Sequence, residues 1–132
     1  MAEPQYSGNY CFACGRDNPI GLHLDFSEQD GKYVAVKTLP REFQSYNGIL
    51  HGGIVTTLLD EAMGGMLYEK EGAPALTAKL EVRYHHPTPI GEELTIVGWE
   101  ESRRRNMVHM QAEIKLADGT VTAEASAKMM IQ

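Results

Sequence analysis

The sequence predicts an α+β fold in which a six-stranded antiparallel sheet wraps around one long helix. Three observations support this prediction. Residues 52–70 carry apolar side chains at helical spacing, and six other segments alternate apolar and polar residues as strands do. The connections between the strands are short, which favours antiparallel pairing. With 132 residues, the chain suits a single domain, residues 1–132, with one core.

The part of the chain before the helix is expected to contain two strands. Residues 1–21 read as an irregular N-terminal segment, because glycine and proline punctuate it. Apolar and polar residues then alternate over 22–27, which predicts a first strand. The run Gln-Asp-Gly-Lys at 29–32 is typical of a turn, and residues 33–39 form the second predicted strand.

The spacing of apolar residues changes from helical to alternating after residue 74, which predicts one helix followed by four strands. On a helical wheel the apolar side chains of 52–70 gather on one side, and Gly72-Ala73-Pro74 ends the helix. Asp118-Gly119 is a strong hairpin signal. The alternating segments that follow the helix are 76–85, 93–101, 108–116 and 121–131. One sheet and one helix leave much of the sheet exposed, so we expect the chain to form an oligomer.

Composition excludes several classes of function. The net charge of −6 argues against nucleic-acid binding. No apolar run approaches the roughly 20 residues that a membrane span needs. The first ten residues lack a basic stretch followed by an apolar one, so we see no signal peptide and expect a cytoplasmic protein.

The two cysteines, Cys11 and Cys14, form a Cys-X-X-Cys pair that suggests either a redox dithiol or half of a zinc site. A zinc site takes four ligands, no second cysteine pair exists, and completing it would need histidines such as His23. A strand-helix-strand context for a redox pair is also missing. We therefore predict two partly buried thiols in a structured turn, and no metal site.

The start of the helix combines features that suit acyl chemistry. The first N–H groups of a helix lack intrahelical partners and carry partial positive charge, so they can polarise a carbonyl oxygen. Gly52 and Gly53 let such an oxygen approach closely. Asp60 follows two turns later, among small neighbours that leave room for a substrate. Amide and carboxylate together suit acyl transfer or hydrolysis, with Asp60 as general base or nucleophile.

The segment Gly48-Ile49-Leu50-His51-Gly52-Gly53, with Asp60 nine positions after His51, resembles the hotdog-fold acyl-CoA thioesterases. The resemblance is greatest to the group related to phenylacetic-acid-pathway thioesterases. It extends over nearly the whole chain, through residues 72–77, 80–84 with Pro87, and the N-terminal Cys-X-X-Cys-Gly with residues 18–22.

The resemblance implies a dimer or a dimer of dimers with the active site at the subunit interface. It implies that the Gly52 amide polarises the thioester carbonyl, that Asp60 acts as base or nucleophile, and that Thr77 of the partner chain positions water. His51 would orient the helix entry or the sulfur side of the thioester. Many relatives carry asparagine six positions before the histidine, where this chain has Ser45, whereas Asn47 lies four before it.

Alternatives remain for several of these residues. Taken alone, His51 is better read as a plain helix-entry residue than as a residue that transfers a proton. Asp60 has the alternative of a core acid that stabilises a dimer through hydrogen bonds. Glu61 is a second, weaker candidate for the acid, or a solvated or interface residue. The triplet 103–105 falls in a predicted turn, and its arginines are either solvated or bound to the phosphates of coenzyme A. Candidate substrate-binding residues are Asn47, Gly53, Glu61, Arg83, Arg103, Arg104 and Arg105.

The sequence thus favours an acyl-CoA thioesterase that releases a free acid and coenzyme A, and that needs no cofactor beyond the coenzyme A of its substrate. One rival is a non-catalytic hotdog protein that binds or senses acyl-CoA, for which the acid would be unnecessary. Another is a hotdog enoyl-CoA hydratase or dehydratase, which uses a different arrangement of acid and histidine. The segment His85-His86-Pro87 does not supply that arrangement convincingly.

Overall fold

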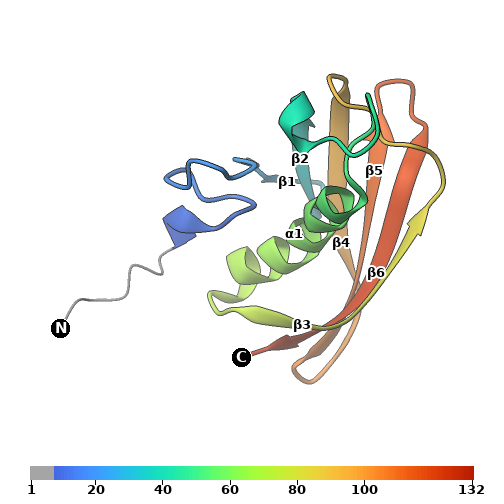
Figure 1. The fold of residues 1–132 in the computed structure, drawn as a ribbon. Coiled ribbons are helices and arrows are strands. Elements are labelled where there is room, and N and C mark those ends of the chain that lie inside the picture. The colour runs from blue at the N-terminus through green and yellow to red at the C-terminus, as the bar shows by residue number, and fades with distance from the viewer. Residues whose placement is uncertain (1–7) are drawn as a thin grey trace.

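In the computed structural model, which describes residues 8–132, a six-stranded antiparallel sheet curves around helix α1, Gly52–Glu71 (Figure 1). The strand order is β1-β2-β4-β5-β6-β3, so β1 and β3 form the two edges. The predicted fold class is therefore confirmed. The strands are β1 (Ser27–Gln29), β2 (Lys32–Thr38), β3 (Ala75–Tyr84), β4 (Glu93–Arg104), β5 (Met107–Leu116) and β6 (Val121–Ile131).

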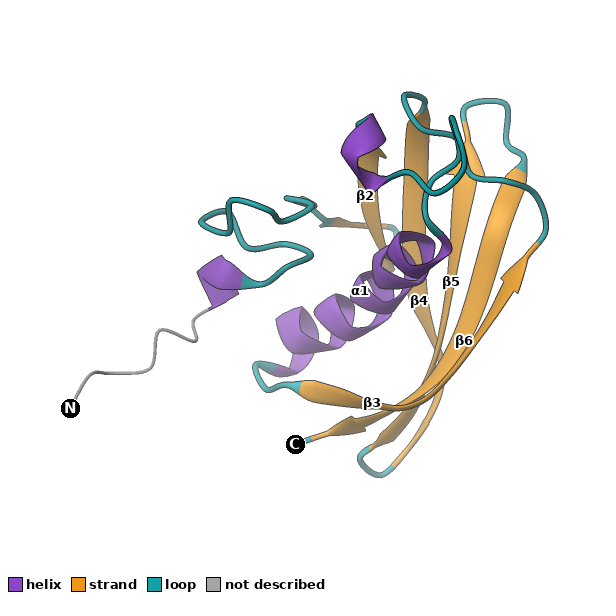
Figure 2. Cartoon of the chain, in the orientation of Figure 1, coloured by secondary structure: helices purple, strands orange, loops and turns teal. Residues whose placement is uncertain are grey.

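The helix lies in the concave side of the sheet, and loops gather at its N-terminal end (Figure 2). Two short 3-10 helices, Gly8–Tyr10 and Arg41–Phe43, interrupt the loops before it. No helix within residues 8–132 is long and apolar enough to cross a membrane. The predicted hairpin at Asp118-Gly119 is confirmed, since Gly119, with a φ of 90°, lies between the antiparallel strands β5 and β6. The predicted turn at 29–32 is also confirmed, since Asp30 and Gly31 connect β1 and β2 with φ angles of 54° and 79°.

The first predicted strand was placed too early in the sequence. Leu22 and Leu24 are buried, as expected for alternating apolar residues, but strand β1 begins only at Ser27. His23 has a φ of 53°, in the left-handed region, which interrupts an extended backbone. The amides of Leu22 and Leu24 instead donate to the carbonyls of Phe12 and Ala13, at 2.8 and 2.9 Å. This segment therefore pairs with the N-terminal segment rather than with the sheet.

Small residues on the sheet let α1 approach it closely. Gly98 of β4 lies under the helix, and a Cβ atom built there would come within 2.3 Å of the Ala62 carbonyl oxygen. Three alanines of β6 at alternate positions, 123, 125 and 127, are also buried in the core. The expected close contact between the last strand and the helix is thus observed.

A bulge in β3 changes which side chains face the helix. Thr77 pairs with Met129 of β6, but the next pairing joins Lys79 to Lys128, so Ala78 is an extra residue. Side chains alternate along a regular strand, and one extra residue reverses that alternation. Thr77 therefore lies on the same face as Leu80 and Val82, whereas the regular pattern predicted it on the opposite, polar face.

The prediction of a turn at residues 103–105 is wrong for its first two residues, which belong to strand β4, and this strand contains a second bulge. Strand β4 continues to Arg104, so only Arg105, with a φ of 58°, lies in the turn. The β4–β5 register shifts between Glu100 and Ser102, which leaves Glu101 unpaired. Arg103, opposite the buried Val108, consequently faces the side of the sheet that carries the helix.

Candidate active site

The helix begins with a histidine cap. The Gly53 amide donates a hydrogen bond to His51 Nδ1 at 2.9 Å, and His51 is the N-cap residue of α1. The His51 carbonyl accepts from the Ile54 and Val55 amides. For the Gly52 amide, no hydrogen bond is found within residues 8–132. Of the two glycine amides expected to bind a carbonyl oxygen, Gly53 is therefore engaged in the cap and Gly52 is free.

The structure brings Thr77 and Asp60 together. The Thr77 hydroxyl donates a hydrogen bond to Asp60 Oδ1 at 2.9 Å, and Asp60 is half-buried on the helix. Both residues belong to the same chain, because residues 72–74 return the chain directly from α1 into β3 and the bulge at Ala78 then turns Thr77 toward the helix. The resemblance implied that Thr77 of the partner chain positions water, and this role stays a prediction.

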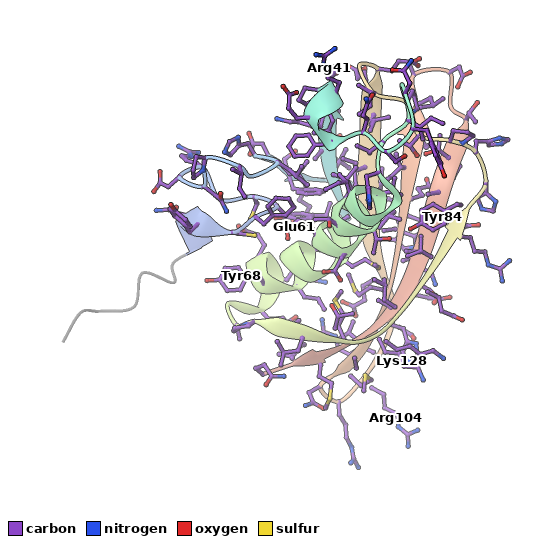
Figure 3. The ribbon with its side chains drawn as sticks, viewed as in Figure 1. Arg41, Glu61, Tyr68, Tyr84, Arg104 and Lys128 are labelled. Carbon is purple, nitrogen blue, oxygen red and sulfur yellow. The ribbon has the colours of Figure 1, made fainter. Side chains whose placement is uncertain are left out.

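Tyr84 is a residue of the site that the sequence did not single out. Its hydroxyl donates to the Gly52 carbonyl oxygen at 3.0 Å and lies 2.7 Å from Thr56 Oγ1. It thereby supports the first turn of α1 from strand β3 (Figure 3). Its alternation with Leu80 and Val82 placed it on the apolar face, but nothing in the sequence indicates that its hydroxyl reaches the helix start.

Beside the helix start lies an open groove of about 380 Å³. Gly52 and Tyr84 contribute to it from α1 and the end of β3, and Tyr46, His85 and Thr88 line it from the neighbouring loops. The volume falls within the roughly 300–1,000 Å³ of small-molecule sites. Gly52, whose amide has no hydrogen bond within residues 8–132, is thus part of the lining of this groove.

Glu61 follows Asp60 in the sequence but points elsewhere. Its carboxylate lies beside Cys11 and Cys14 of the N-terminal segment. Burial raises the pKa of the Glu61 carboxyl; a hydrogen bond with Cys14 opposes this rise, and the charge of Asp60 adds to it. The sequence predicted two partly buried thiols, and the structure has Cys11 partly buried and Cys14 exposed, both without a disulfide.

The remaining predicted binding residues lie apart from the Asp60–Thr77 pair. Asn47 is exposed in the loop before α1, and Ser45 donates its hydroxyl to the Ile49 carbonyl at 3.3 Å. Arg83 is exposed and alternates with Tyr84, so it occupies the face of β3 opposite the helix.

Arg103 is occupied by ion pairs. Its guanidinium donates to Glu71 Oε2 at 2.8 Å, and to both carboxylate oxygens of Glu100, at 2.9 and 3.1 Å. Lys70 joins the same group through Glu100 Oε1 at 3.2 Å. Arg103 thus stabilises the C-terminal end of α1. Arg104 and Arg105 are also exposed, and neither forms an ion pair within residues 8–132.

Comparisons with known proteins identify similar sequences. The model of the thioesterase superfamily matches residues 47–123, which include the helix start, Asp60 and Thr77. Human acyl-coenzyme A thioesterase 13 is 30% identical over 71 residues, which cover 53% of this chain and 51% of that protein. The mouse protein of that name is 36% identical over 50 residues, or 37% and 36% of the two chains. The chain thus spans about half the length, or less, of these curated relatives.

Solved structures show the same fold. A thioesterase superfamily protein superposes with a TM-score of 0.84 and 28% identity, over 94% of this chain and 61% of that one. A hypothetical thioesterase from Streptococcus pneumoniae, solved with coenzyme A, gives a TM-score of 0.74 at 23% identity, over 83% and 88% of the two chains. The family model, matched over more than half of the sequence, establishes that this chain belongs to the thioesterase superfamily.

Proposed function

We propose that this protein is an acyl-CoA thioesterase that hydrolyses a thioester to a free acid and coenzyme A. The observation that carries the proposal is the half-buried Asp60 carboxylate, which the Thr77 hydroxyl holds by a 2.9 Å hydrogen bond at Oδ1. Its other oxygen, Oδ2, has no hydrogen bond within residues 8–132 and is free to take a proton. The named relatives are acyl-CoA thioesterases, and the pneumococcal neighbour holds coenzyme A.

The reaction requires a base near water and a donor near the carbonyl oxygen. Asp60, as general base, removes a proton from water while the water oxygen bonds to the thioester carbon. The Gly52 amide stabilises the negative charge that develops on the carbonyl oxygen. The carbon–sulfur bond then breaks, and the leaving thiolate takes the proton from Asp60. If Asp60 is instead the nucleophile, its own oxygen bonds to the carbonyl carbon and the carbon–sulfur bond breaks, which releases the coenzyme A thiolate. Water then hydrolyses the resulting anhydride to the free acid and the Asp60 carboxylate, and the proton that water gives up passes to the thiolate.

The distance between these two groups supports a site shared by two copies of the chain. Asp60 lies eight positions after Gly52, which corresponds to a rise of about 12 Å along an α-helix. The contacts from the amide to the carbonyl oxygen, from the carbon to water and from water to the carboxylate are each about 3 Å, and in series they span about 10 Å. We therefore infer that Gly52 of one copy and Asp60 of another act on one thioester.

Strand β3 is suited to bring two copies together. It lies at an edge of the sheet, and its Leu76 and Tyr84 side chains are 59% and 55% exposed. An exposed edge strand can pair with the equivalent strand of another chain. We propose a dimer, or a dimer of dimers, joined at this edge.

The test is release of free thiol from a panel of short, medium, long and aromatic acyl-CoA substrates. We expect Asp60→Asn to lower kcat by about 10²–10⁴-fold, while the circular dichroism spectrum and acyl-CoA binding stay unchanged. Glu69→Gln, an exposed acid on the same helix, serves as the charge-matched control and should retain activity. A wild-type protein that binds acyl-CoA but releases no thiol from any substrate would refute the proposal in favour of a binding protein.

A further inference from the structure

The N-terminal segment and the central helix together place three metal-binding side chains at one point. The sulfur atoms of Cys11 and Cys14 and a carboxylate oxygen of Glu61 all lie within 4.8 Å of one another. It is the one group of three or more such side chains at this spacing found in residues 8–132. Figure 3 shows Glu61 on the side of α1 that faces the N-terminal segment.

A tight turn fixes the two cysteines. The Gly15 amide donates to the Cys11 carbonyl at 2.8 Å, and a Cβ atom on Gly15 would come within 2.3 Å of the Cys11 nitrogen. Only glycine fits a backbone approach of this kind. The carbonyls of Phe12 and Ala13, between the cysteines, accept hydrogen bonds from the amides of Leu22 and Leu24, whose side chains are buried. Backbone hydrogen bonds of the N-terminal segment thus fix the positions of the two cysteines.

The chemistry of this group suits a divalent cation. All three side chains become negative when they lose a proton, and no ion pair to Glu61 is found in the described part of the chain. Thiolates select zinc over magnesium or calcium, and carboxylates also bind zinc. Zinc bonds of about 2.0–2.3 Å place tetrahedral ligand atoms about 3.3–3.8 Å apart, so the three atoms would draw together by up to about 1.5 Å. Cys14 is exposed, which gives an ion a path of entry.

We propose that Cys11, Cys14 and Glu61 bind a zinc ion that fastens the N-terminal segment to α1. A water molecule or an added ligand completes the tetrahedral coordination. His23, which the sequence suggested as a completing ligand, lies outside the group, and its Nε2 is 2.7 Å from the Asn18 carbonyl oxygen. The sequence predicted no metal site because the third ligand, Glu61, lies 47 positions after Cys14. Only the fold brings Glu61 close to the two cysteines.

Cobalt is the probe that reports on the ligands themselves. The full chain is reduced, stripped of metal with a chelator and titrated with Co²⁺, then with Zn²⁺ in competition. We expect one metal ion per chain and a thiolate-to-cobalt charge-transfer band, which Cys11→Ser and Cys14→Ser each remove. Glu61→Gln should weaken binding about tenfold or more, whereas Glu81→Gln, a charge-matched change of an exposed acid on β3, should not.

A thermal melt separates a lost ligand from a misfolded variant. Zinc should raise the Tm of the wild type and of Glu81→Gln, and should raise that of the cysteine variants much less. A reduced wild-type protein with two titratable thiols and no charge-transfer band would overturn the proposal. It would also be overturned if Glu61→Gln bound cobalt as tightly as Glu81→Gln. Since the readout is metal binding and not thioester hydrolysis, the result is independent of the proposed function.

Discussion

Thr77 and Asp60, seventeen positions apart in the sequence, are joined by a hydrogen bond of 2.9 Å from hydroxyl to carboxylate. The bond depends on the extra residue, Ala78, in the edge strand β3. It fixes one carboxylate oxygen and leaves the other free for chemistry. This pair is the centre of the proposed site, and the first prediction concerns it.

Replacing Thr77 by valine keeps the shape of the side chain and removes the hydrogen bond. A hydrogen bond to a charged group contributes about 1.5–3 kcal/mol, so we expect kcat to fall about 10–100-fold with little change in KM. Thr77→Ser should restore most of the activity because it restores the donor. Steady-state kinetics of the three proteins is the measurement. Equal kcat values for the valine and serine variants would show that the hydroxyl does not act on Asp60.

Two glycine-to-alanine changes should alter stability in opposite directions. At Gly98 a Cβ atom would overlap the Ala62 carbonyl, 2.3 Å away, so we expect a loss of about 1–3 kcal/mol in the free energy of unfolding. At Gly64 the nearest atom is the Met129 methyl carbon at 3.7 Å, an ordinary contact. There the better helix propensity of alanine should add up to about 1 kcal/mol. Urea unfolding of both variants tests this, and similar effects would contradict it.

The ion pairs of Arg103 should make stability depend on pH. The hydrogen bond from Arg103, more than that from Lys70, lowers the pKa of Glu100 from its usual 4.5. A carboxyl whose pKa is lower in the folded state stabilises the fold above its unfolded pKa, and this contribution is lost as the pH falls through the folded value. Arg103→Met should therefore cost about 1 kcal/mol near neutral pH and much less in acid.

The measurement is urea unfolding of wild type and Arg103→Met between about pH 7 and pH 3. Arg104→Met, a change of the exposed neighbour, is the control and should follow the wild-type pH profile. A constant difference between Arg103→Met and wild type across this range would show that the Glu100 carboxylate does not account for the effect.

Arg104 and Arg105 test the predicted contact with the phosphates of coenzyme A. Both side chains are exposed at the β4–β5 turn. Replacing both with glutamine should raise KM for acyl-CoA about threefold to tenfold and leave kcat unchanged, because phosphate contacts bind the substrate and the transition state alike. An acyl-pantetheine substrate, which lacks the nucleotide phosphates, should show no change. Arg16→Gln is the control, and an equal rise in KM for both substrates would refute the contact.

Much of the fold could be predicted from periodicity, and the failures have local causes. The helix and the last four strands were placed within a few residues, since their apolar patterns are long and regular. The segment 22–26 has the same pattern, but the positive φ of His23 prevents a strand there. A segment outside the sheet that buries every second side chain shows the same alternation of apolar and polar residues as a strand.

The site was predictable only as far as its residues lie on one element. The spacing of His51, Gly52 and Asp60 can be read along a single helix. Only the family resemblance indicates Thr77 as a site residue. The face of the strand on which its side chain lies depends on a bulge for which the sequence gives no signal. The contacts of Tyr84 with Gly52 and of Glu61 with Cys14 are tertiary, and no local pattern encodes them.

The bulge at Ala78 means that strand length, and not only residue identity, places the threonine. Deleting Ala78 would restore regular alternation in β3. The side chains before the deletion, or those after it, would then move to the opposite face of the sheet. Every amino acid of the proposed site would still be present, yet Thr77 would turn away from Asp60 or Leu80 away from the core. Insertions and deletions in this strand can therefore abolish activity in family members whose motif residues are all intact.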